Sequence, residues 1–253
     1  QFPVLHAQPE PVRVPGAGIS NSNVSAGVYV VAESPASTTG YTSAWTCTGG
    51  TLTGNELTVT NGATVTCYVV NDDNASTVTL HKVVINDDGG TATGEEFFLT
   101  LTPSAGGAAL IDDQDPAPST SASDLGDGAS SSLVNAGTYT LGEHGGPAGY
   151  TDLGWHCVVT GTTDVVAVDA NDGITVGNGA DITCYVTNDD QPATLTLTKI
   201  VNNDDGGNAG PGDFTLKATN NGQEYELSGA GGAATSTAPA GTYELSETGP
   251  AGY

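Results

Sequence analysis

The chain has 253 residues, and 29 acidic residues against four Lys and Arg residues give it a formal net charge of −25. Nucleic acid and anionic membranes attract basic surfaces, so we expect neither as an electrostatic partner, and cations are the natural counter-species. No apolar run approaches the roughly 20 residues that span a bilayer, so we expect no membrane insertion. Abundant Thr, Val and Gly with recurrent turn dipeptides favour short strands and almost no helix.

The chain is built from an internal repeat, whose clearest copies lie at 77–101 and 194–218. These copies are TVTLHKVVINDDGGTATGEEFFLTL and TLTLTKIVNNDDGGNAGPGDFTLKA. The other matched segments are AGVYVVAES, AGTYTLGEH and AGTYELSET at 26–34, 136–144 and 240–248, and TVTCYVVNDD and DITCYVTNDD at 64–73 and 181–190. Only the stretch 75–190 contains every segment of the repeat, so it is the one complete unit.

The repeat divides the chain into four parts. Residues 1–25 are Pro-rich and predict an extended arm, with one short strand around Val12 and Val14. The remaining parts are the C-terminal part of a first unit at 26–74, the complete unit at 75–190 and the N-terminal part of a third unit at 191–253. We therefore expect an all-β protein with one complete and two partial domains.

Turn-forming residues mark the connections along the chain. NDDGG at 86–90 joins two alternating apolar runs and predicts a hairpin loop in which glycine supplies a positive φ. The stretch 112–132 is polar, has little strand character and predicts a surface loop. NDDNAS at 71–76 and NDDQPA at 188–193 predict short linkers between units.

Four cysteines form two matched pairs, because each repeat copy carries a WxC segment followed by a TCY segment. Three pairings are possible in principle, and the repetition favours Cys47 with Cys67 and Cys157 with Cys184. In the chain-entropy picture each such disulfide stabilises its domain by roughly 3 kcal/mol. A zinc site is a poor alternative because neither a CxxC pair nor a histidine ligand set accompanies the cysteines. Disulfides indicate an oxidising, extracellular setting.

Strand side chains alternate between two faces, so residue parity identifies which side chains share the buried face. A polar residue continues the apolar series on each of three strands of the complete unit, and an uncompensated buried charge costs several kcal/mol, so these groups should meet. The three series are Val78, Leu80, Lys82 and Val84; Tyr139, Leu141 and Glu143; and Ile182, Cys184, Val186 and Asn188.

This pattern resembles the CnaB or SpaA-like prealbumin-fold domains of bacterial surface proteins and pili. The most specific part is GTYxLxExxxPxGY, present as GTYTLGEHGGPAGY and GTYELSETGPAGY, together with the LTLTK strand and the asparagine of the last strand. The resemblance covers nearly the whole chain after residue 25 and implies tandem Ig-like β-sandwiches. It also implies an intramolecular isopeptide bond in which Lys82 is the nucleophile, Asn188 the electrophile and Glu143 the proton shuttle.

The chemistry is physically sensible because burial favours the neutral forms of an amine and a carboxyl group. A neutral lysine attacks the carboxamide carbon, and a neutral acid polarises the carboxamide. The alternative is a buried salt bridge between Lys82 and Glu143, with Asn188 as a hydrogen-bonded neighbour and the disulfide as the covalent staple of the domain.

The two partial units carry complementary parts of the same triad. Glu33 and Asn71 lie in the first unit, and Lys199 and Glu247 in the third. The first unit lacks a lysine strand and should present unpaired edges, which a donated strand from another subunit would cover. Joining the two would let Lys199 reach Asn71 of a neighbouring subunit, with one of the two glutamates redundant. The alternative is that the chain is a section of a longer array.

Other candidate sites are weaker. The acidic loops place Asp87, Asp88, Asp204 and Asp205 as candidate Ca²⁺ ligands, but without the spacing of a dedicated calcium loop a solvated turn is the stronger interpretation. Asn23 and Asn74 lie in Asn-x-Ser sequons. The chain has no GxSxG, HExxH or GxxxxGK[ST] motif, and we expect neither an enzyme nor a required cofactor.

Together these features predict a structural subunit of an extracellular filament, pilus-like fibre or adhesin stalk. The expected partner is the chain itself, as a head-to-tail homopolymer assembled by strand complementation. The alternative function is a cell-surface binding module that recognises a matrix or host ligand through loops such as 112–132.

Overall fold

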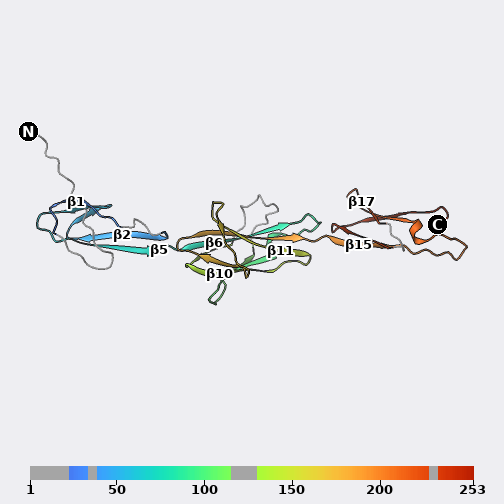
Figure 1. Cartoon of the computed structure of the whole chain (residues 1–253), viewed down its shortest axis with the longest axis horizontal. Coiled ribbons are helices and arrows are strands. Elements are labelled where there is room, and N and C mark those ends of the chain that lie inside the picture. Colours follow the sequence, from blue (N-terminus) through green and yellow to red (C-terminus); the bar gives the residue numbers. More distant parts are fainter. Residues whose placement is uncertain (1–22, 34–38, 115–129, 228–232) are drawn as a thin grey trace, which may run out of the picture. The chain divides into compact units, whose positions relative to one another are not determined.

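The computed structural model describes residues 23–33, 39–114, 130–227 and 233–253 (Figure 1). It is nearly all β, and the helical residues among those described form two single-turn 3₁₀ helices, η1 (Gly94–Glu96) and η2 (Pro211–Asp213). Within these ranges no helix is long and apolar enough to cross a bilayer. The expected strand around Val12 and Val14 lies outside the described residues. The chain divides into two compact parts, Gln1–Ala75 and Ser76–Tyr253, and the second of these contains both the complete unit and the third unit of the repeat.

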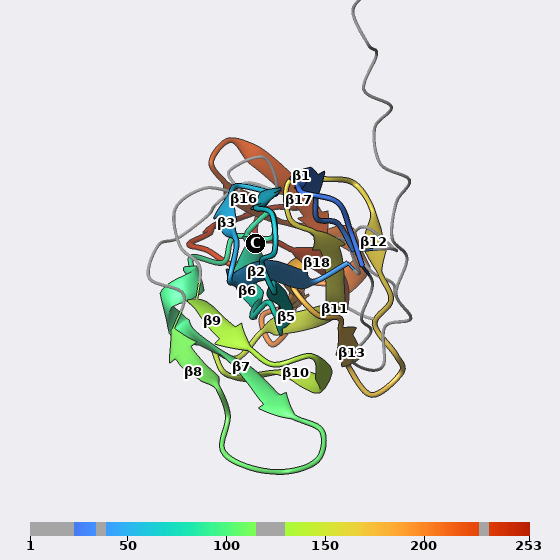
Figure 2. The same cartoon turned by 90° about the vertical axis from the view of Figure 1, so that its left-hand side faces the viewer.

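The complete unit, called the middle sandwich below, consists of two sheets. One has the order β13-β10-β7-β8 and the other β12-β11-β14-β6-β9. Figure 2 shows β7 between β8 and β10. The strands are β6 (Ser76–Ile85), β7 (Phe97–Pro103), β8 (Ile111–Gln114), β9 (Ser130–Val134), β10 (Gly137–Gly145), β11 (Tyr150–Val159), β12 (Val165–Val166), β13 (Gly173–Val176) and β14 (Asp181–Asp190).

The first and last strands of the middle sandwich, β6 and β14, are neighbours and run parallel. Their register pairs Lys82 with Val186 and Val84 with Asn188. The alternating faces follow the sequence prediction, because the inward residues of both strands lie in the core. The core comprises Val78, Leu80, Leu99, Leu101, Ile111, Val134, Tyr139, Leu141, Cys157, Ile174, Val176, Ile182, Cys184 and Val186. Each fully buried aliphatic side chain stabilises the fold by about 1.5–3 kcal/mol.

The prediction of a hairpin at 86–90 is wrong. Strands β6 and β7, which this loop joins, lie in different sheets and do not pair. Gly89 does adopt the expected positive φ, at 87°. Alternation shows which face of each strand is buried, but it does not distinguish two strands paired in one sheet from two strands that face each other across a sandwich.

The two ends of the polar stretch 112–132 form strands, which its composition does not predict. Its first residues belong to β8 and its last to β9, while 115–129 lie outside the described residues. Strand β8 pairs with β7, and β9 pairs with β6. Main-chain pairing with an existing sheet therefore forms strand here without strand-favouring side chains.

The first unit contains two small sheets. Strands β1 (Gly27–Val30), β4 (Glu56–Val59) and β3 (Thr51–Thr53) form one, in the order β1-β4-β3. Strands β2 (Tyr41–Thr48) and β5 (Thr66–Asp73) form the other and lie side by side in Figure 1. By sequence, β1, β2, β4 and β5 correspond to β10, β11, β13 and β14. Among the described strands β5 pairs with β2 alone, whereas β14 pairs with both β11 and β6.

The strands of the third unit correspond to the N-terminal half of the middle sandwich. Strand β15 (Ala193–Thr198) pairs with β18 (Ala233–Ala238). Strands β16 (Thr215–Asn220), β17 (Gln223–Leu227) and β19 (Glu244–Thr248) form a sheet in the order β17-β16-β19. These pairings repeat those of β6 to β10. Strand β15 therefore has, among the described residues, no strand in the position that β14 occupies beside β6.

Candidate covalent cross-link site

Lys82 lies in the core of the middle sandwich. It follows Val78 and Leu80 on the inward face of β6 and is 1% exposed. Its Nζ forms an ion pair with the Glu143 carboxylate and lies 4.2 Å from the centroid of the Phe97 ring. An aromatic face attracts a cation, so Phe97 provides a second stabilising contact for a buried ammonium group.

Glu143 and Asn188 complete a triad that joins the two sheets. Glu143 extends from β10 in the four-stranded sheet, whereas Lys82 and Asn188 extend from β6 and β14 in the five-stranded sheet. Asn188 Nδ2 donates a hydrogen bond of 2.6 Å to Glu143 Oε1. Asn188 is 4% exposed. The structure therefore brings together the three polar residues that parity placed inward.

The carboxamide oxygen of Asn188 is the unsatisfied atom of this site. It is buried, and within the described ranges it has no hydrogen-bond partner. Leaving a buried acceptor without a donor costs about 1–3 kcal/mol. Rotating the carboxamide by half a turn exchanges its oxygen and nitrogen, so either atom can be placed toward Glu143.

The partial units hold matching fragments of the triad. Lys199 Nζ lies 2.8 Å and 2.9 Å from the two Glu247 carboxylate oxygens and 4.0 Å from the centroid of the Phe214 ring. In the first unit Asn71 Nδ2 donates a 2.8 Å hydrogen bond to Glu33 Oε1. The third unit thus has the lysine and a glutamate, and the first has the asparagine and a glutamate.

Phe97 and Phe214 are site residues that parity reasoning missed. They follow acidic residues at matched places in the repeat, EEF and GDF, and both rings lie beneath a lysine amine. A second repeated contact supports these aromatic residues. Tyr150 packs edge-on against Phe97 and Tyr253 against Phe214, with ring centroids 6.0 Å and 5.6 Å apart. The sequence did carry a signal for these two site residues, because the phenylalanine recurs at the same place in both copies of the repeat.

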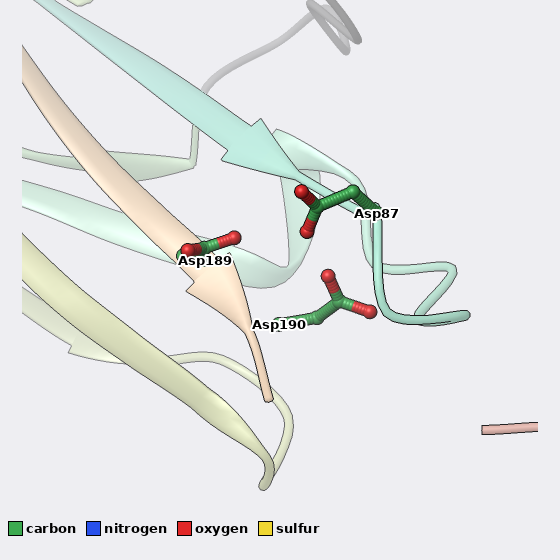
Figure 3. Close-up of side chains that lie close together, drawn as sticks. All are labelled: Asp87, Asp189 and Asp190. Atoms are coloured by element: carbon green, nitrogen blue, oxygen red, sulfur yellow. The ribbon is translucent and has the colours of Figure 1, made fainter. Parts of the chain in front are cut away.

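Three carboxylates gather at the end of β14. Figure 3 shows Asp189 and Asp190 on this strand and Asp87 on the neighbouring loop. One carboxylate oxygen from each residue lies within 4.8 Å of the corresponding oxygens of the other two. Asp190 has a structural role, because it accepts hydrogen bonds from the backbone N–H groups of Asp88 at 3.0 Å and Gly90 at 2.5 Å.

Asp88 itself does not join this carboxylate cluster. Partial loss of hydration, followed by the charges of Asp87, Asp190 and Asp189, raises the pKa of Asp88 above its ordinary value. Of the other sequence-predicted calcium ligands, Asp87 is in the cluster, whereas Asp204 and Asp205 are exposed in the third unit.

Both predicted disulfides are present. Cys47 bonds to Cys67 across β2 and β5, and Cys157 bonds to Cys184 across β11 and β14. Each disulfide therefore joins directly paired strands. Cys184 lies four residues before Asn188 on the inward face of β14, so one strand carries both the disulfide and the triad asparagine.

A family model matches the chain three times, once for each copy of the repeat. The family model described as a prealbumin-like fold domain, SpaA_2, matches residues 4–69, 73–186 and 190–253. The first match begins within the stretch 1–25 that the sequence predicts as an arm. No curated protein sequence matches the chain.

Two solved structures also match. The Bacillus anthracis TIE protein is 18% identical, with a TM-score of 0.45, and the match covers 88% of this chain and 36% of that one. The Streptococcal ancillary pilin is 18% identical, with a TM-score of 0.26 and coverage of 81% and 72%. The chain thus spans about a third of the length of the first of these proteins.

Proposed function

We propose, since the chain belongs to the SpaA-type family of prealbumin-like fold domains, that it is a structural subunit of a pilus or another surface protein. In this role its sandwiches act as spacers in an extracellular filament, pilus-like fibre or adhesin stalk. The observation that carries the proposal is the buried triad, in which Glu143 contacts both Lys82 on the first strand of the domain and Asn188 on its last strand.

The proposed staple is an isopeptide bond between Lys82 and Asn188. Glu143 takes a proton from the Lys82 ammonium group, and the neutral amine attacks the Asn188 carboxamide carbon. Glu143 then passes that proton to the departing nitrogen and accepts a second proton from the attacking nitrogen, which becomes the N–H of the new amide. An amide bond from Nζ to Cγ forms, the bond from Cγ to Nδ2 breaks, and one ammonia leaves. The burial of Lys82 and Asn188 supports this sequence because it excludes water from the reacting groups.

The intact mass of the reduced chain tests the staple. We expect wild-type protein to be lighter than its sequence mass by one ammonia, and peptide mapping to find Lys82 joined to Asn188. Lys82→Arg and Asn188→Ala should each show the full sequence mass, since arginine is a poor nucleophile and alanine has no carboxamide. A wild-type monomer at its full mass would leave the salt bridge as the correct description of the triad.

The assembly we propose is head-to-tail strand complementation between subunits. Some residues that are buried in the middle sandwich have exposed counterparts in the first and third units. Leu141 is 2% exposed and its counterpart Leu245 is 64% exposed. Val186 is 0% exposed, and its counterpart Val69 is 36% exposed. Among the described strands, these positions lie on edges without a further partner, and apolar residues at such an edge favour the addition of a strand.

Electron microscopy and sedimentation of the purified chain test this assembly. We expect filaments whose length grows with protein concentration. Because an inserted charge opposes burial at the junction, Val69→Asp and Leu245→Asp should each shorten the filaments and leave the middle sandwich folded. Dispersed monomers at high concentration would contradict strand complementation, and specific binding of such monomers to a matrix ligand would support the adhesin alternative.

A further inference from the structure

The loop at 86–90 of the middle sandwich contacts the third unit, which belongs to the same compact part of the chain. The backbone N–H of Ala240, between β18 and β19, donates a 2.7 Å hydrogen bond to the carbonyl oxygen of Asp88. We infer that this loop is a docking surface for the next unit of the same chain, and that docking holds the two units in one orientation. The inference rests on the proposed spacer role for its use, but the contact itself is tested apart from filaments and isopeptide bonds.

Gly89 shows how closely the two units fit together. A Cβ at this position would lie 2.3 Å from the carbonyl oxygen of Ala240 and 2.9 Å from its nitrogen. Both of these atoms belong to the backbone, so no flexible side chain can move aside to make room. Gly89 also has a φ of 87°, which favours glycine. The docking surface therefore depends on the absence of a side chain at position 89.

Contacts within the middle sandwich hold the docking loop in shape. Asp190 is 3% exposed and accepts hydrogen bonds from the backbone N–H groups of Asp88 and Gly90, at 3.0 Å and 2.5 Å. Beyond the loop, the backbone N–H of Ala92 donates a 2.9 Å hydrogen bond to the hydroxyl oxygen of Tyr150. The Asp88 carbonyl is thus presented by a backbone that is already ordered, so docking costs little further conformational entropy.

The third unit holds its own side of the contact with a tyrosine. Tyr243 donates a 2.6 Å hydrogen bond from its hydroxyl group to the carbonyl of Pro239, which precedes Ala240. In the middle sandwich Tyr139 makes the same contact, at 2.8 Å, with the residue four positions before it. The NDDGG sequence of the docking loop also recurs, at 203–207. Both sides of the contact are therefore recurring parts of the repeat.

The linker between the two units supplies a second point of attachment. Strand β14 ends at Asp190 and β15 begins at Ala193, so only Gln191 and Pro192 connect them. The backbone N–H of Gln191 donates a 2.8 Å hydrogen bond to the carbonyl of Gly149 in the middle sandwich, and the proline ring fixes its own φ. A linker alone permits rotation, whereas a linker and a separate docking contact oppose it. The two units should therefore move as one body.

Residual dipolar couplings of the backbone amides of the full chain test the docking. We expect a single alignment tensor to fit the middle sandwich and the third unit of the wild type. Gly89→Ala should require separate tensors, because its Cβ displaces Ala240 and breaks the hydrogen bond. Gly206→Ala is the matched control, because Gly206 has a φ of 89° in the corresponding loop of the third unit and a Cβ there meets no atom within 4 Å. This control should keep the single tensor.

Hydrogen exchange at the Ala240 amide measures the contact directly. We expect Gly89→Ala to speed this exchange about tenfold and Gly206→Ala to leave it unchanged, since only the first variant breaks the hydrogen bond. Wild-type exchange of the β6 and β14 amides in both variants separates lost docking from unfolding of the middle sandwich.

The outcomes separate the docking from the proposed function. Separate tensors in the wild type, or a single tensor and an unchanged Ala240 exchange rate in Gly89→Ala, would overturn the docking and leave the role as a surface-protein subunit standing. Conversely, a chain that forms neither filaments nor the isopeptide bond but keeps the single tensor would retain the docking and count against the proposed function.

Discussion

At the scale of single residues, each member of the triad is stabilised by a contact with a residue of the opposite sheet. Lys82 has a carboxylate on one side and an aromatic face on another, so its charge is compensated without water. Removing one partner of a buried ion pair typically costs about 3–5 kcal/mol, because the other charge stays buried. The contact with Glu143 therefore compensates the buried charge of Lys82, and losing either partner would destabilise the middle sandwich.

Asp169, in the loop between β12 and β13, offers a test of pH dependence. The backbone N–H groups of Gly173 and Asn171 donate to its carboxylate at 2.9 Å and 2.7 Å, and they lower the pKa of Asp169 below its ordinary value. A lowered folded-state pKa stabilises the fold above the unfolded pKa, and this contribution disappears as the pH falls through the folded value.

We expect Asp169→Asn to lower the thermal midpoint at neutral pH, because it keeps the acceptor oxygen and removes the charge. The difference from wild type should shrink as the pH is lowered below the ordinary range of an aspartate. Asp164→Asn, at a nearby exposed carboxylate, controls for a change in net charge. A difference that stays constant with pH would contradict the role of the Asp169 charge.

At the scale of elements, the turn after β10 packs against the Phe97 ring, which lies beneath the Lys82 amine. Gly146 has a φ of 80°, and a Cβ at this position would lie 2.4 Å from the Phe97 ring. Gly249 repeats the arrangement against Phe214, with a separation of 2.2 Å. Glycine is therefore required at position 146 both for backbone conformation and for the closeness of the ring, and at position 249 for the closeness of the ring.

Gly146→Ala should destabilise the middle sandwich more than Gly149→Ala. Gly149 also has a positive φ, 92°, but a Cβ there meets no atom within 4 Å. Both variants carry the strain of a left-handed alanine, so the difference of about 1–3 kcal/mol reports the displacement of Phe97 alone. Chemical denaturation measures it, and equal free energies of unfolding would show that the ring moves aside without loss.

The elements also show which features a sequence predicts in this fold. Alternation predicted the buried faces of β6, β10 and β14 correctly, because a one-residue shift would move every apolar side chain into water. Repetition predicted both disulfides. The pairing of strands was harder, as the loop at 86–90 shows, because the partner of a strand depends on contacts between residues far apart in the sequence. Phe97 escaped notice for a related reason, since its role comes from a lysine on another sheet.

At the scale of the whole molecule, the repeat brings triad residues together in three places. Among the described residues, lysine, glutamate and asparagine meet in the middle sandwich, while lysine meets glutamate in the third unit and asparagine meets glutamate in the first. The glutamate is therefore the partner common to all three places, where it compensates the lysine charge or accepts a hydrogen bond from the asparagine.

The parallel contact between β6 and β14 has a mechanical consequence. The chain enters the middle sandwich at Ser76, the start of β6, and leaves it at Asp190, the end of β14. A tension along the chain therefore pulls these two adjacent strands past each other, loading all their hydrogen bonds at once. With the proposed bond in place, force passes from Lys82 directly to Asn188, and the residues between them carry none.

Single-molecule stretching distinguishes a middle sandwich with the proposed bond from one without it. We expect the wild-type middle sandwich to show no extension step, and Asn188→Ala to show one, since forced unfolding then depends on the barrier to shearing the strands. A reductant should lengthen the extra step in Asn188→Ala by releasing the loop closed by Cys157 and Cys184. In wild type the reductant should add no extension from that loop, because both cysteines lie between Lys82 and Asn188, where the chain carries no force once the proposed bond has formed. The middle sandwich would then act as an inextensible link under load.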